Sequence, residues 1–172
     1  MQSDKKLYKF LKKYQETLPS FHDGRIDYTN SKSAPVVVVF LKYKEKMLLL
    51  KRSKKVNSYK GKWQTIAGYI DDFRSVYERM MIELHEEIGL NKKDIKEMRI
   101  ANQYKVDDKK IKKVWFVNPG IAYLKRKPKV KIDWEHTDYK WINPSELKKF
   151  SIVYKVDESY RRAVKGKKIK LT

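Results

Sequence analysis

The segment from Gly68 to Leu90 constrains the fold of this chain more than any other part of the sequence, because it specifies one helix and its end. Apolar side chains recur every four residues between Val76 and Ile88, which predicts an amphipathic helix over residues 75–88. Gly89 follows at the place where helices commonly end in a left-handed residue. The segment therefore predicts a helix whose apolar stripe packs on a core.

Three carboxylates share one face of this predicted helix. Glu83, Glu86 and Glu87 are three and four residues apart, so at about 100° per residue they fall within roughly a third of the helix circumference. Such carboxylates repel one another unless a positive group lies between them, and Mg²⁺ or Mn²⁺ prefers oxygen ligands of this kind. The alternative is a merely solvated acidic face, which is the commonest meaning of this spacing on its own.

The charge of the chain is strongly positive and unevenly distributed. The 172 residues carry a net charge of +21, yet residues 63–108, which include the predicted helix, have more acidic than basic side chains. Carboxylates that hold cations between two basic arms suit an anionic polyphosphate substrate, although lysines that only confer solubility explain part of the excess. The chain has no Cys, which excludes disulfides, thiolate metal sites and a thiol nucleophile.

The same segment resembles the Nudix box, usually written G-x5-E-x7-R-E-U-x-E-E-x-G-U, where U is an aliphatic residue. The positions in register are Gly68, Glu83, Leu84, Glu86, Glu87, Gly89 and Leu90. Two positions depart from the box, since Arg74 stands in place of its Glu and Ile82 in place of its Arg. In the family this pair supports the metal-binding carboxylates, whereas the E-x-x-E-E run carries the metals. The resemblance implies an α/β fold, the Nudix-type α/β/α sandwich with a mixed, curved sheet and, here, an N-terminal helical extension.

The resemblance also implies a reaction, the metal-dependent hydrolysis of a diphosphate linkage in a nucleoside diphosphate linked to X or a related nucleotide. Glu83 and Glu87 would hold Mg²⁺ or Mn²⁺, and the Gly68 loop could add a backbone carbonyl. Glu86 would be a further ligand or position the water, and either Glu86 or the loop residue Glu135 would take its proton. The alternative is a catalytically decayed module that binds nucleotide or RNA, because the box lacks its supporting pair.

Four further residues are expected at the site. The order of strand, Arg loop, G-x-W, Gly and helix is similar to that of the family, and it implies that Arg52 and Trp63 bind substrate, with Arg52 on phosphate. For the lysines near Arg52, an exposed solvated loop is the simpler interpretation. Arg79 precedes Glu83 by four residues on the same helix face and is expected to steady that carboxylate, with help from Asp71 in the loop.

The chain is expected to comprise an N-terminal extension over residues 1–33 and a Nudix domain over residues 34–172. The extension should contain a helix over residues 4–18 and no chemistry of its own. In the domain, the pattern predicts one strand over residues 98–106 and another strand that Pro119-Gly120 interrupts.

The remaining expectations concern the C-terminus and the partners. A helix within residues 151–164 should precede a basic tail over residues 165–170, and His136 is interpreted as incidental. No apolar run approaches the length of a membrane span, which favours a cytoplasmic protein. A nucleotide or other diphosphate is the expected ligand, while RNA on the basic surface and a homodimer stay open.

Overall fold

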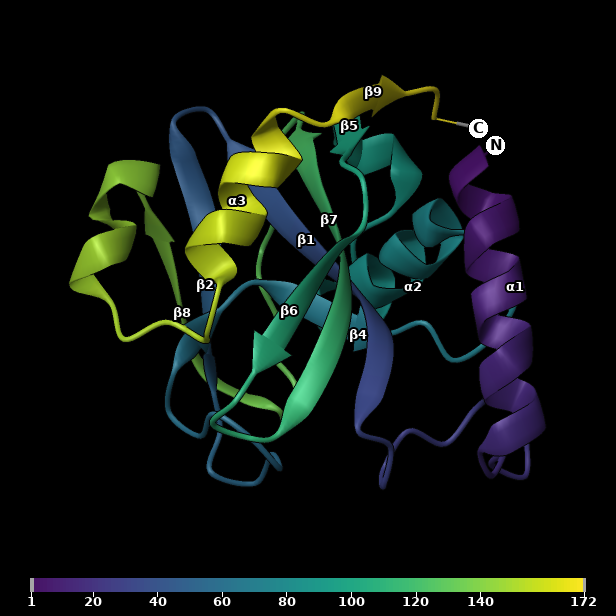
Figure 1. Cartoon of the computed structure of the whole chain (residues 1–172). Coiled ribbons are helices and arrows are strands. Elements are labelled where there is room, and N and C mark those ends of the chain that lie inside the picture. The colour runs from purple at the N-terminus through teal and green to yellow at the C-terminus, as the bar shows by residue number, and fades with distance from the viewer. Residues whose placement is uncertain (1, 172) are drawn as a thin grey trace.

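The structure, a computed structural model that describes residues 2–171, confirms the predicted α/β architecture, with a mixed, curved sheet between helices (Figure 1). In chain order the elements are α1 (Gln2–Thr17), β1 (Ser33–Tyr43), β2 (Lys46–Arg52), β3 (Trp63–Gln64), β4 (Ile66–Tyr69), α2 (Val76–Ile88), η1 (Lys92–Asp94), β5 (Ile95–Ile100), β6 (Tyr104–Asp108), β7 (Lys113–Leu124), β8 (His136–Ile142), η2 (Pro144–Lys149), α3 (Val156–Val164) and β9 (Lys167–Ile169), where η marks a 3₁₀ helix.

The described residues form one nine-stranded sheet with the order β3-β2-β1-β7-β5-β9, to which β4, β6 and β8 add by pairing with β1, β7 and β2. The central strands β1 and β7 are parallel, and the other pairs are antiparallel. Strand β1 pairs with β4 over residues 36–39 but with β2 only at residues 42–43. Because β1 changes partner along its length, the sheet splits there, and β4 is followed by the loop of residues 70–75 and then by α2.

Alternating side chains of β1 divide the interior into two cores, as expected for a strand buried on both faces. Val37, Val39 and Leu41 belong to the larger core, which the apolar sides of α1 and α2 also enter. Phe40 belongs to the smaller core, which includes Val156 and Ala163 of α3. Helices α1 and α2 therefore cover one face and α3 the other (Figure 1).

Two strand predictions were wrong in the same region. The single strand expected over residues 98–106 is two strands, β5 and β6, while β7 runs without interruption through Pro119 and Gly120. The two errors have one cause, because the gap between β5 and β6 lies opposite Pro119, and the Pro119 carbonyl there accepts a hydrogen bond from Ala101 N (2.9 Å). The missing N–H of proline thus falls where the partner strand is itself broken.

The N-terminal extension contributes side chains to the larger core. Leu7 and Leu11 of α1, together with Ile26 and Tyr28 of the following loop, are buried against the same residues as α2. At the other end, the predicted last helix is confirmed as α3, and part of the expected basic tail forms β9 beside β5.

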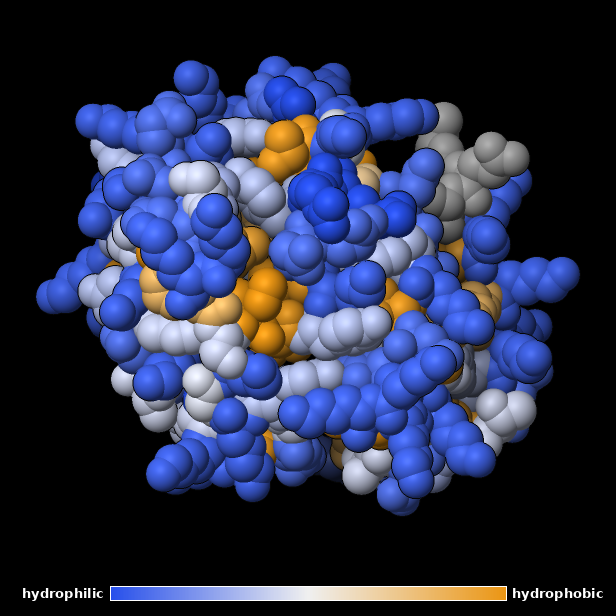
Figure 2. Space-filling view, turned by 60° about the vertical axis from the view of Figure 1, so that its left-hand side comes forward, coloured by the Kyte–Doolittle hydropathy of each residue, from blue (hydrophilic) through white to orange (hydrophobic). Residues whose placement is uncertain are grey.

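The face of the molecule in Figure 2 is largely hydrophilic, and its apolar side chains show mainly in a central hollow. Among the described residues, no helix is both long and apolar enough to span a membrane.

Candidate functional site

Helix α2 is fixed at both ends by the residues that its sequence supplies, and the predicted helix is confirmed. The Ser75 side chain accepts a hydrogen bond from Glu78 N (3.2 Å), and the Glu78 carboxylate accepts one from Ser75 N (2.8 Å). This reciprocal capping box starts the helix. Gly89 ends it in the left-handed region (φ 70°), as predicted, and its N–H bonds back to the carbonyl of His85.

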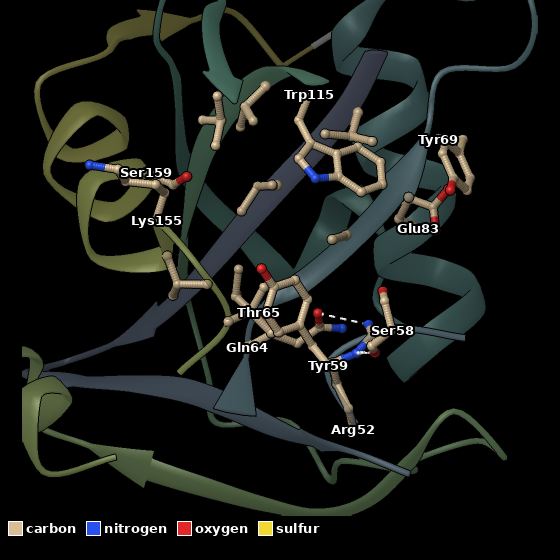
Figure 3. Close-up of a pocket in the computed structure, with 18 of the residues that line it drawn as sticks. Arg52, Ser58, Tyr59, Gln64, Thr65, Tyr69, Glu83, Trp115, Lys155 and Ser159 are labelled. Carbon is tan, nitrogen blue, oxygen red and sulfur yellow. Dashed lines mark hydrogen bonds between the residues drawn. The ribbon is translucent and has the colours of Figure 1, made fainter. Parts of the chain in front are cut away.

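A cavity of about 440 Å³ lies beside the acidic face of α2. Its walls come from β1, β4 and α2, the loop between β2 and β3, the β6–β7 hairpin, the loop before β8 and the start of α3. Figure 3 shows Glu83 and Tyr69 on one side of this space, Ser159 and Lys155 on the other, and Trp115 and Tyr59 between them. The sequence-predicted residues Gly68, Asp71, Arg52, Arg79, Glu83, Glu86, Glu87 and Glu135 all line this cavity.

Glu83 packs directly against Gly68. A Cβ atom built on Gly68 would fall within 3.0 Å of the Glu83 carboxyl group, so only a residue without a side chain allows this approach. The Glu83 side chain is 13% exposed. Burial raises the pKa of Glu83 to about 7, opposed by the nearby Arg79 charge and reinforced by Glu86.

Glu87 is buried more deeply than Glu83, and only one of its two carboxylate oxygens has a hydrogen-bond partner. Its Oε1 atom accepts a hydrogen bond from Ala67 N (3.3 Å), whereas Oε2 has no hydrogen-bond partner in the structure. His136 Nε2 is 3.9 Å from Oε2, beyond hydrogen-bond reach. Burial, together with the charge of Glu83, raises the pKa of Glu87 well above its usual range. A buried carboxylate oxygen without a partner is costly, and a cation is one group that would satisfy it.

The pKa of Glu83 predicts how the stability of the metal-free protein depends on pH. Unfolded, this carboxyl has its ordinary pKa of 4.5, and folded its pKa is about 7, so between these values the folded state binds more protons. We therefore expect the free energy of unfolding to fall as the pH rises from 4.5 to 7, by up to about 3 kcal/mol from this group. Denaturation in urea across this range measures the slope, which should become flatter in Glu83→Gln. An equally steep slope in that variant would contradict the assignment.

The loop before β8 brings Glu135 to the cavity and is held by His136. The His136 ring is buried, with Nδ1 3.2 Å from Asp133 Oδ1 and Nε2 3.4 Å from Gln64 Nε2. Burial lowers the pKa of His136, whereas burial and the Asp133 charge raise the pKa of Glu135. His136 therefore holds the loop that carries Glu135 and is not incidental. The feature of the sequence that could have indicated this role is its position next to Glu135.

Helix residue Arg79 joins the loop before α2 to the acidic face of the helix. Its Nη2 donates to Asp71 Oδ1 (2.6 Å) and Asp72 Oδ2 (2.7 Å), and its Nη1 lies 3.6 Å from Glu83 Oε1. Only 4% of Arg79 is exposed. Arg74, which replaces the box Glu, points elsewhere and forms an ion pair with Asp72.

Arg52 lies at the cavity, and two of the five N–H donors of its guanidinium are engaged in hydrogen bonds. Its Nε donates to Ser58 O (2.9 Å) and its Nη1 to Gln64 Oε1 (2.9 Å), which fixes the plane of the guanidinium (Figure 3). Burial lowers the pKa of Arg52, opposed by the charge of Glu135. Trp63, expected to bind substrate, does not line this cavity. It is buried in the smaller core against Phe150, with ring centroids 5.4 Å apart.

The sequence did not single out the aromatic side of the cavity. Tyr59 donates its hydroxyl proton to Asp108 (2.6 Å), which ties the loop between β2 and β3 to the β6–β7 hairpin. Trp115 of β7 and Tyr104 of β6 complete this side. Periodicity could not separate Tyr104 and Trp115 from core aromatics, because half-buried positions of a strand look alike in sequence, and Tyr59 lies in a loop, where periodicity gives no information.

The carboxylates form a suitable donor set for a hard divalent cation, although the described residues do not converge on one point. No group of three or more His, Asp or Glu side chains in residues 2–171 is arranged to hold an ion as it stands. Two features nevertheless fit a cation, namely the partnerless Glu87 Oε2 and the purely carboxylate chemistry of the acidic face.

Comparisons with known proteins agree with this architecture. The MutT protein from Methanosarcina mazei Go1 is 20% identical and superimposes with a TM-score of 0.63 over 77% of this chain and 94% of that chain. A MutT NUDIX hydrolase from Burkholderia pseudomallei is 16% identical, with a TM-score of 0.64 over 77% and 98% of the two chains. The NUDIX domain of NrtR from Shewanella oneidensis, solved with ADP ribose, is 16% identical, with a TM-score of 0.62 over 77% and 88%.

At these identities the solved structures establish only the fold. The family is established by a match between this sequence and the model of a protein family. No curated protein sequence matches the chain. The model of the NUDIX domain matches residues 32–163, which are most of the chain and include every carboxylate of the acidic face. This chain belongs to the Nudix family.

Proposed function

We propose that this protein is a metal-dependent hydrolase that cleaves a diphosphate linkage in a nucleoside diphosphate linked to a further group. One observation carries the proposal, namely that a single cavity combines the acidic face of α2, the Arg52 guanidinium and an aromatic side. Carboxylates suit a divalent cation, a guanidinium suits phosphate, and aromatic rings suit a nucleobase. The structural relative solved with ADP ribose supports this substrate class, because ADP-ribose is such a compound.

Glu83, Glu86 and Glu87 would hold Mg²⁺ or Mn²⁺, and Gly68, which lies against the Glu83 carboxyl group, would contribute its backbone carbonyl. When bound, such an ion polarises a phosphate oxygen and lowers the pKa of the attacking water. Glu87 is the strongest candidate ligand, since its Oε2 has no other partner.

Glu135 is better suited than Glu86 to accept the proton of the attacking water. Its pKa is raised by burial and by Asp133, which brings it closer to neutrality, where a general base is most effective. Glu86 is exposed on α2 and suits a role as a further ligand or in positioning the water.

Arg79 and Asp71 take over the support that the box Glu and Arg supply elsewhere in the family. Arg79 lies between the Asp71 carboxylate and Glu83, so it can fix the orientation of Glu83 without occupying both of its oxygens. The Asp71–Arg79 pair has the same charges as the Glu–Arg pair of the box. Its acid is at position 71 where the box has position 74, and its arginine is at position 79 where the box has position 82.

A screen of nucleoside diphosphate compounds with Mg²⁺ or Mn²⁺, read by product masses, tests this function. Products that correspond to cleavage between two phosphorus atoms, formed only when the cation is present, are the expected result. If no compound is cleaved although nucleotides still bind, the protein is a binding module that has lost catalysis.

Arg52→Ala should raise the KM of the active substrate by about 10- to 100-fold with a much smaller change in kcat. A charge-assisted hydrogen bond to phosphate contributes about 1.5–3 kcal/mol, and its loss affects binding before chemistry. The matched control is Lys54→Ala, which removes an exposed positive charge two residues away. Steady-state kinetics give KM and kcat for both variants. An unchanged KM in Arg52→Ala would mean that Arg52 only stabilises its loop and does not bind the substrate.

A further inference from the structure

The N-terminal extension reaches the cavity through a residue that precedes those that the family model matches. Arg25 is one of the cavity-lining residues, and the match begins only at residue 32. Three contacts join this part of the extension to the loop before α2. Ile26 N donates to Asp71 O (2.8 Å), Tyr28 Oη donates to Ile70 O (3.0 Å), and Arg25 Nη1 donates to Asp71 Oδ2 (3.2 Å).

A tight turn presents Arg25 to this loop. Asp23 accepts hydrogen bonds from both Arg25 N (3.1 Å) and Arg25 Nε (2.8 Å), and Phe21 N donates to Arg25 O (2.8 Å). Gly24 adopts φ 83°, which a residue with a side chain rarely does, so it allows the chain to reverse here. The guanidinium is therefore held by its own turn while one of its nitrogens points to Asp71.

The Arg25 contact begins a chain of charges that ends at a proposed metal ligand. Asp71 binds Arg25 through Oδ2 and Arg79 through Oδ1, and Arg79 in turn lies beside Glu83. Each oxygen of Asp71 thus has its own arginine. If Arg25 were absent, Asp71 would depend on Arg79 alone, and its negative charge, no longer shared with Arg25, would draw that guanidinium away from Glu83.

We propose that the N-terminal extension completes the active site, with Arg25 as a positioning residue that neutralises Asp71 and so leaves Arg79 to orient Glu83. The inference rests on the proposed metal-dependent function of the cavity. It also explains how this chain can work with Arg74 and Ile82 in the box, since the missing support is rebuilt from residues of the loop, the helix and the extension.

The experiment compares Arg25→Ala, Arg25→Lys and the control Lys32→Ala in the full chain. Lys32 is an exposed residue of the same extension that does not line the cavity. Loss of a group that orients a metal ligand typically costs 10- to 100-fold in metal affinity or activity. We therefore expect Arg25→Ala to lower kcat by about 10- to 100-fold with KM within about twofold, and to weaken Mn²⁺ binding measured by calorimetry without substrate. Arg25→Lys should recover part of both, and Lys32→Ala should behave as wild type.

A double-mutant cycle with Asp71→Asn tests whether Arg25 acts through Asp71. If it does, Arg25→Ala should cost little more in the Asp71→Asn background, whereas additive losses would overturn the inference. A raised KM with unchanged kcat would also overturn it, because Arg25 would then contact the substrate itself. Unchanged kinetics and Mn²⁺ affinity would reduce the extension to a packing role. If wild type cleaves nothing but Arg25→Ala still weakens Mn²⁺ binding, the proposed hydrolysis fails and the role of Arg25 stands.

Discussion

Glu87→Gln should lower the rate of metal-dependent hydrolysis by about a thousandfold while the protein becomes more stable in the absence of metal. The substitution keeps the shape of the side chain, and the amide oxygen can still accept the hydrogen bond from Ala67 N. The variant loses the charge of the buried oxygen that has no partner, and with it one anionic ligand, whose contribution to the transition state is several kcal/mol. The same change removes the cost of burying or protonating a carboxylate, so the free energy of unfolding should rise.

Turnover with saturating Mg²⁺ and denaturation in urea without metal measure the two effects on the same preparation. The matched control is Glu45→Gln, which removes one exposed carboxylate from the turn between β1 and β2 and should change neither quantity. A variant that keeps its activity would remove Glu87 from the catalytic site. A variant that loses both activity and stability would show that the Glu87 carboxylate is structural.

Gly68→Ala should abolish most of the activity, by about a hundredfold or more, with little loss of stability. The new methyl group would collide with the Glu83 carboxyl group, which is the flexible end of a long side chain and can rotate away. The fold therefore tolerates the change, but Glu83 can no longer occupy the position beside β4, and displacement of a reacting group by about 1 Å costs about 100-fold in rate.

A double-mutant cycle isolates this effect, because the methyl group acts only through Glu83. In a Glu83→Ala background, Gly68→Ala should lower the rate no further, since the cavity left by the shorter side chain accommodates the methyl group. Far-ultraviolet circular dichroism and the melting temperature report on folding. A large loss of stability in Gly68→Ala would mean that backbone conformation, and not the Glu83 contact, requires glycine here.

The parts of the site that a single segment encodes could be predicted from the sequence. Helix α2, its Gly89 cap and the placement of Glu83, Glu86 and Glu87 on the side of the helix that faces the cavity follow from spacing alone, because helical geometry fixes which residues share a face. The Arg79 contact with Glu83 was predicted for the same reason.

The parts that depend on tertiary contacts could not be predicted. Arg25 belongs to no motif, and contacts between parts distant in the sequence bring it to Asp71, namely the packing of Ile26 and Tyr28 against the core and their hydrogen bonds to the loop before α2. Trp63 shows the opposite error, since a motif placed it at the site whereas the smaller core buries it against Phe150. Sequence patterns of this kind specify a face of an element, but not which neighbour covers that face.

The short strand β9 is an edge strand of the sheet, and its sequence discourages self-association at that edge. Beside β5 it presents Lys167 and Lys168, and Lys168 Nζ forms an ion pair with Glu97 (2.9 Å). Lysine side chains on an outer strand discourage the same strand of another molecule from pairing with it, because like charges would have to approach closely. A chain that ends at residue 166 would expose the backbone donors and acceptors of β5, and its solubility would decrease more than its catalytic rate.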